Sequence, residues 1–170
     1  MVANIFRIRP VCEQACPYAG RTRSYKNGYV INIKQLTWVY RKIEMIKKII
    51  DQNALAPTSP FSHLVMDDHY AYVAGRVAAD LPGHEKILGD TRAEAQLILD
   101  SIKVLLEAEG ISMDQIVRCD VHLTEMDEIG EMDKAYGTFF SDSAYPARTC
   151  TQSNKLFGGS RVEITCVAKR

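Results

Sequence analysis

Apolar and polar residues alternate along five short segments of this chain, and most of these segments are rich in β-branched residues. Such alternation predicts half-buried β-strands, because successive side chains of a strand point to opposite faces of its sheet. The predicted strands are residues 62–66, 70–75, 116–123, 146–150 and 161–168.

Two other segments carry apolar residues at the spacing of an α-helix. Residues 91–109 present one aliphatic stripe and are followed by Gly110, a common helix stop, and residues 127–140 predict a second helix. The element order ββ-α-β-α-ββ predicts an α+β fold in which one mixed β-sheet carries both helices on one face.

The strand at 116–123 predicts what the uncovered face of that sheet looks like. We expect Val117 and the alternate apolar residues after it to face the helices, whereas Arg118, Asp120 and His122 face away. A polar face in the middle of a sheet favours coverage by another subunit.

The charge of the chain changes sign near residue 45. Residues 1–45 carry eight Lys or Arg and two Glu, a net charge of +6, and the remainder balances this at −6. Residues 1–44 show no sustained period apart from a candidate strand at 30–40. We therefore expect a basic N-terminal extension at 1–44, poorly ordered or dispensable, before a folded domain at 45–170. The expected location is cytoplasmic, with organellar targeting by the extension as the alternative.

Composition argues against several classes of partner. The acidic remainder of the chain does not suit a nucleic-acid groove, which must neutralise phosphates. No apolar run approaches the roughly 18 residues of a membrane span. The five cysteines are odd in number, and Cys12 and Cys16 have no second pair to complete a zinc site. We expect reduced thiols, no metal, no membrane and no nucleic-acid partner.

Two charged residues near the C-terminus are candidates for chemistry on a small acid. Arg148 shares a strand face with Cys150, and Glu163 interrupts an apolar strand, where a carboxylate is costly unless it is paired or used. We expect the two strands to be neighbours. Arg148 would then hold a carboxylate while Glu163 activates a water, or the two residues would form a structural ion pair.

Seven short motifs follow one another across the domain, at residues 56–62, 72–75, 91–110, 121–126, 136–140, 146–150 and 162–164. In order and spacing they resemble the reactive intermediate (imine/enamine) deaminases, the RidA/YjgF-like family. The resemblance implies a chorismate-mutase-like (YjgF-like) fold and a homotrimer with clefts between subunits. It also implies hydrolysis of enamines and imines such as 2-aminoacrylate to 2-keto acids and ammonia, without a metal or organic cofactor.

The resemblance assigns roles to individual residues. It implies that Arg148 grips the substrate carboxylate and that Glu163 holds or activates the attacking water. Cys150 would line the same cleft, where a neighbouring cation favours its thiolate. The backbone of Gly75 would lie where the substrate approaches the chain closely, which glycine permits.

Four further positions of the implied cleft depart from the family's usual residues. Phe61 stands where tyrosine is common, Ala74 where serine is common, Asp133 where asparagine is common and Arg76 where glutamine is common. These departures predict a bulkier or more anionic substrate, with Arg76 holding a second carboxylate. Alternatively, Arg76 points to solvent and the pocket is unselective.

Other interpretations stay open at this point. A non-catalytic trimer that binds 2-keto acids would also use Arg148, and nucleic-acid cleavage is a third, less favoured activity. His63 flanks the first hairpin, and we expect it to be solvated or to cap the hairpin rather than to act in catalysis.

Overall fold

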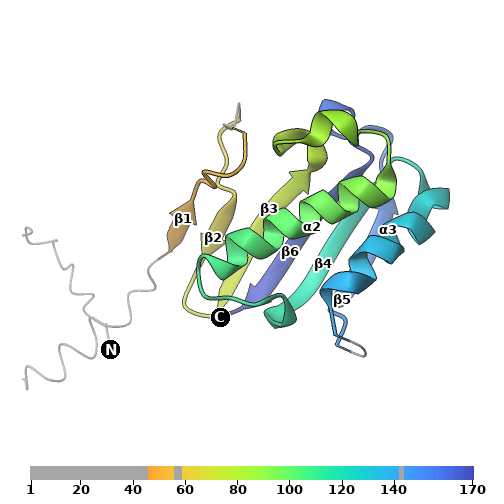
Figure 1. Ribbon diagram of the computed structural model, residues 1–170. Helices are drawn as coiled ribbons and strands as arrows, with labels where there is room; N and C mark the ends of the chain where they lie inside the picture. The colour runs from red at the N-terminus through yellow and green to blue at the C-terminus, as the bar shows by residue number, and fades with distance from the viewer. Residues whose placement is uncertain (1–45, 56–58, 142–143) are drawn as a thin grey trace, which may run out of the picture. The chain divides into compact units, whose positions relative to one another are not determined.

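The computed structural model describes residues 46–55, 59–141 and 144–170. They form one six-stranded sheet with two α-helices against one of its faces (Figure 1). The strands are β1 (Lys47–Ile49), β2 (Leu64–Met66), β3 (Tyr70–Val77), β4 (Ile116–Leu123), β5 (Ala147–Gln152) and β6 (Val162–Lys169). The helices are α2 (Thr91–Glu107) and α3 (Ile129–Tyr136). The predicted extension at 1–44 and its candidate strand at 30–40 lie outside the described residues.

The sheet is mixed, and its strands follow the order β1-β2-β3-β6-β4-β5. Only β4 and β5 run parallel, and the other four neighbouring pairs are antiparallel. The predicted α+β fold and the five predicted strands are confirmed, with shifts of one or two residues at several ends. The sequence pattern missed β1, because this edge strand has three residues, of which Lys47 and Lys48 are exposed.

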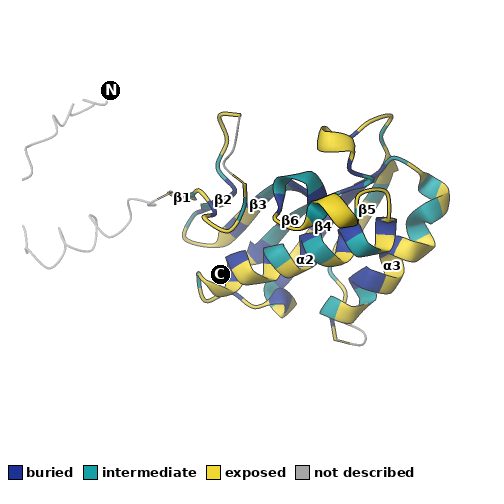
Figure 2. Cartoon of the chain, turned by 45° about the horizontal axis from the view of Figure 1, so that its top comes forward, coloured by how far each residue is buried: buried dark blue, intermediate teal, exposed yellow. Residues whose placement is uncertain are grey.

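Helix α2 supplies most of the apolar layer that covers the sheet. The Asp90 side chain accepts a hydrogen bond from the backbone N–H of Ala93 and caps the helix start. The inward face of α2 is buried and its outward face is exposed (Figure 2). The buried aliphatic residues of α2 pack with those of the strands in a single core. None of the helices in the described parts of the chain has the length and apolar character to cross a membrane.

Helix α3 is shorter than predicted. Its regular part has eight residues, and single 3₁₀ turns at 126–128 and 137–139 replace the expected helical ends. Met132, Ala135 and Tyr136 face the core, so the predicted second helix is present, with shorter bounds than expected. Short turns of this kind are common at helix ends.

A bulge in β4 changes which side chains face the core. Ile116 pairs with Ala168 and Arg118 pairs with Val167, so Val117 is the extra residue between two paired positions. Ile116 is buried, while Val117 is 43% exposed. The prediction that Val117 faces the core was therefore wrong, because one inserted residue breaks the alternation.

A second bulge lies in β3. Val73 pairs with Cys166, and Arg76 pairs with Ile164. Ala74 and Gly75 therefore both lie opposite the single β6 residue between Ile164 and Cys166. This extra residue turns the side chain of Arg76 toward the buried face of the sheet, where its partner Ile164 also lies. It also lets Ala74 and Gly75 approach one pocket together.

Candidate functional site

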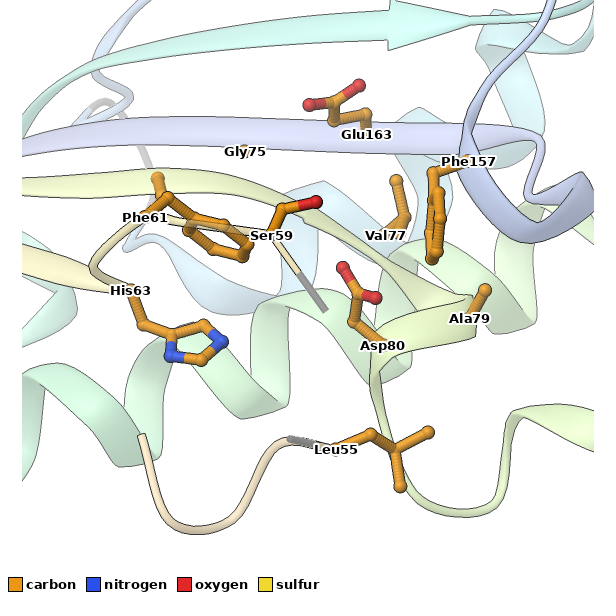
Figure 3. A pocket seen from close by; sticks show the side chains of 11 residues that line it. Leu55, Ser59, Phe61, His63, Gly75, Val77, Ala79, Asp80, Phe157 and Glu163 are labelled. Carbon is orange, nitrogen blue, oxygen red and sulfur yellow. The ribbon is translucent and has the colours of Figure 1, made fainter. Parts of the chain in front are cut away.

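A pocket of about 510 Å³ lies at the C-terminal end of β3, bounded by β6 and by the chain before β2 (Figure 3). Its polar lining residues are Ser59, His63, Asp80 and Glu163. Its larger apolar lining residues are Leu55, Phe61, Val77 and Phe157. Small residues, Ala74, Gly75 and Ala79, complete the lining. Four of the predicted site residues therefore share this pocket: Phe61, Ala74, Gly75 and Glu163.

The carboxylate of Glu163 packs directly against the backbone of Gly75. Glu163 pairs with His122 of β4 and with Val77 of β3, which places its side chain on the sheet face that the helices leave uncovered. A Cβ added to Gly75 would lie 2.0 Å from Oε1 of Glu163. Gly75 is not among the glycines with positive φ. Glycine is thus required here for space and not for backbone conformation.

His63 lies in the pocket wall with only 4% of its surface exposed. Its Nδ1 accepts a hydrogen bond of 3.0 Å from the backbone N–H of Asp51, and the Phe61 ring packs edge-on at 5.1 Å between centroids. Burial, helped by the nearby Arg76 cation, lowers the pKa of His63. The expectation of a solvated or capping histidine was wrong, because the chain before β2 folds the ring inward.

Arg76 neither enters the pocket nor points to solvent. It is 3% exposed, and its Nη2 lies 2.5 Å from Oδ2 of Asp51, while Nη1 donates to the Ser101 hydroxyl at 3.2 Å. Burial alone would raise the pKa of Asp51, but the Asn53 N–H and the Arg76 guanidinium lower it below its usual value. Both predictions for Arg76 fail for the same reason: the β3 bulge turns its side chain toward the core.

Arg148 lies in a different pocket, of about 450 Å³, between α3 and the start of β5. Its Nη1 is 2.5 Å from Oδ1 of Asp133, and its guanidinium lies 4.8 Å from the centre of the Tyr136 ring. Arg148 pairs with Cys119 of β4, a fully buried residue of the helix-covered face. The Arg148 guanidinium, which was expected to hold a substrate carboxylate, thus forms an ion pair with Asp133.

Arg148 and Glu163 do not meet within one chain. Strand β4 lies between β5 and β6, and the two side chains start from opposite faces of the sheet. The expectation of neighbouring strands was wrong, and so was the alternative of an ion pair between these two residues. The order of strands depends on long-range pairing, which periodicity does not report.

Cys150 shares the face of Arg148, as predicted, but lines neither of these two pockets. It packs against the apolar core. Burial raises the pKa of the Cys150 thiol. Arg148 lowers this pKa and Asp133 raises it, and the net shift is upward. The prediction that the neighbouring cation favours a thiolate was therefore wrong.

Seven of the eleven lining residues were not among the predicted site residues, and Asp80 and Phe157 are two of these. Asp80 ends the 3₁₀ turn that follows β3, and burial raises the pKa of its carboxyl despite opposing effects of His63 and Arg76. Phe157 contributes an aromatic side chain, and 61% of the residue's surface is exposed. The available signal for Asp80 was its place in the loop after the predicted strand at 70–75, since loops often carry functional side chains.

Comparisons with known proteins cover the same part of the chain. The family model described as Endoribonuclease L-PSP matches residues 51–170. The 2-iminobutanoate/2-iminopropanoate deaminase of Mus musculus is 33% identical over 125 residues, covering 73% of this chain and 92% of that protein. A RutC family protein of Pyrococcus horikoshii is 28% identical over 124 residues, covering 73% of this chain and 98% of that protein.

Solved structures share the fold. TdcF of E. coli with bound serine is 28% identical, with a TM-score of 0.65 over 73% of this chain and 99% of that one. The YjgF gene product of E. coli is 25% identical, with a TM-score of 0.66 over 73% of this chain and 98% of that one. The family match over residues 51–170, together with the relatives and the shared fold, shows that this chain belongs to the RidA/YjgF family.

Proposed function

We propose that this protein hydrolyses reactive enamines and imines to 2-keto acids and ammonia. The observation that carries the proposal is the Glu163 carboxylate, held against the Gly75 backbone in the wall of a pocket of about 510 Å³. The relative in Mus musculus that is named an imine deaminase supports the same reaction class.

Glu163 is suited to general-base catalysis on a water molecule. As the water oxygen bonds to the imine carbon, the carboxylate accepts the proton that the water loses. Addition to the protonated imine gives a neutral carbinolamine, and the same carboxyl group returns the proton to its nitrogen, which leaves as ammonia. As the carbonyl forms, the carbinolamine hydroxyl releases its proton to the carboxylate that has just been freed. One water is consumed, one C–N bond breaks and the carbon becomes a carbonyl, so the step needs no oxidant or reductant.

Arg148 is proposed to bind the substrate carboxylate from a neighbouring subunit. Within one chain Arg148 and Glu163 start from opposite faces of the sheet, so a single subunit does not bring them to one substrate. We propose a homotrimer in which Arg148 of one subunit adjoins the Glu163 pocket of the next. The uncovered sheet face with Arg118, Asp120 and His122 supports this, because another subunit would cover it.

The test generates 2-aminoacrylate in solution and measures the rate of keto-acid formation. Wild-type protein is expected to accelerate hydrolysis, and Glu163→Gln is expected to reduce kcat by about 10²- to 10⁴-fold, the usual contribution of a general base. Glu107→Gln, an exposed change on α2, is the matched control and is expected to leave the rate unchanged. Binding of a 2-keto acid without any acceleration would instead identify a non-catalytic binding protein.

A further inference from the structure

We propose that the part of the pocket beside Asp80 is a subsite for a positively charged group. The preferred substrates would then be imines whose side chain ends in a guanidinium or an ammonium. This inference rests on the proposed function, because the imine carbon is taken to react at Glu163. It reverses the anionic preference that the sequence suggested from Arg76.

The charge of the pocket wall is the first observation that favours a cationic group. Two carboxylates, Asp80 and Glu163, line the pocket, and no Lys or Arg is among its described lining residues. Arg76, whose charge acts on both His63 and Asp80, is buried outside the pocket lining, and its charge is matched by Asp51. A second carboxylate on a substrate would therefore meet like charges, whereas a cation would meet two opposite ones.

His63 does not change this balance at neutral pH. The ring is buried, and its Nδ1 accepts the backbone N–H of Asp51, so that nitrogen is not the protonated one. Burial and Arg76 both lower the pKa of His63, which keeps the ring uncharged. In Figure 3 one ring nitrogen of His63 lies on the side of Asp80, where it can donate to a polar substrate group.

The shape and the aromatic lining fit an extended side chain. In Figure 3 Glu163 lies at one end of the group of lining side chains and Asp80 lies toward the other, with Phe61 and Phe157 flanking the space. A carboxylate binds a guanidinium through two parallel charge-assisted hydrogen bonds. The faces of Phe61 and Phe157 add cation–π attraction. The volume of about 510 Å³ exceeds what 2-aminoacrylate fills.

The experiment compares two substrates that differ in charge and hardly in shape. Imines are generated from L-arginine and L-citrulline with an amino-acid oxidase, and a third from L-glutamate. We expect kcat/KM for the arginine imine to exceed that for the citrulline imine by about tenfold, with the glutamate imine lowest. Asp80→Asn is expected to remove the arginine advantage, so that the arginine and citrulline imines have about the same kcat/KM in this variant. The control is Asp114→Asn, an exposed change outside the pocket, which is expected to keep the advantage.

Binding of the amino acids themselves separates the two proposals. Calorimetry on the wild-type protein with L-arginine and L-citrulline needs neither turnover nor a variant. Tighter binding of arginine without any imine hydrolysis would refute the proposed function and support the subsite. Hydrolysis of all three imines at equal kcat/KM, or an arginine advantage that survives Asp80→Asn, would refute the subsite and leave the proposed function standing.

Discussion

Gly75 and Glu163 are in such close contact that the backbone of one residue fixes the carboxylate of the other. A methyl group on Gly75 would overlap Oε1 of Glu163, at 2.0 Å from its position. The contact depends on the β3 bulge, which turns Gly75 toward β6. Space at residue 75 therefore sets where the proposed catalytic carboxylate lies.

Replacing Gly75 by alanine is expected to displace the Glu163 carboxylate. We predict a loss of about 10- to 100-fold in kcat/KM for imine hydrolysis, because a displacement of about 1 Å is enough to misalign a reacting group. Gly130→Ala is the matched control, since a Cβ there meets nothing within 4 Å. Steady-state kinetics and thermal denaturation of both variants check the prediction. Unchanged kinetics in Gly75→Ala would show that the position of Glu163 does not matter.

Asp133 is expected to compete with the substrate carboxylate for Arg148. The two side chains form an ion pair at 2.5 Å, so a substrate acid must displace Asp133 or share the guanidinium with it. We predict that Asp133→Asn lowers KM for carboxylate-bearing imines by about three- to tenfold with kcat nearly unchanged. Glu131→Gln, a neighbouring acid that pairs with Lys134, serves as control. An equal KM in wild type and Asp133→Asn would contradict the competition.

The buried imidazole of His63 is expected to make stability depend on pH. Its pKa is lowered in the folded chain, so between that value and the ordinary 6.5 the unfolded chain binds more protons. The free energy of unfolding should therefore fall as pH drops below 6.5. Urea denaturation at fixed protein concentration from pH 7.5 downward measures this, and His63→Gln should flatten the slope. His69→Gln, at an exposed histidine, should keep it; equal slopes in all three proteins would argue against a buried neutral ring.

Two inactive variants are expected to restore activity when their subunits mix. If Arg148 of one subunit serves the Glu163 pocket of the next, a mixed trimer of Arg148→Ala and Glu163→Gln chains contains one intact cleft. Random assembly at equal amounts then gives about a quarter of the wild-type rate, and the mixed trimers isolated through both tags, each with one intact cleft of three, give about a third. Co-expression with two different tags, tandem purification and the aminoacrylate assay provide the measurement. Mixed trimers without activity would show that Arg148 and Glu163 of the same subunit act in one cleft.

The sequence predicted local structure well and long-range pairing poorly. Strand β4 was predicted with its observed bounds, 116–123, because the alternation there is nearly regular. The insertion of β6 between β3 and β4 was not predicted, because pairing partners far apart in sequence leave no mark on either segment's period.

The candidate site shows the same division. Glu163 was singled out as a carboxylate within an apolar strand, Gly75 was identified by the family resemblance, and the structure brings them together. Arg76 and Val117 were assigned to the wrong faces, because each lies at a bulge that adds one residue to the alternation. His63 was misjudged because its burial depends on how the chain before β2 folds, which no local pattern records.

The ion pair between Arg76 and Asp51 limits how this pocket can have arisen by mutation. Both side chains are about 95% buried, so a chain that gained or lost only one of them would hold an unmatched interior charge. A lineage can pass between the paired and unpaired forms through neutral amides, such as Asn at 51 or Gln at 76, or by changing both residues in close succession. Substitutions at positions 51 and 76 are therefore expected to occur together among related proteins. Relatives that keep both Asp51 and Arg76 are expected to share this pocket wall.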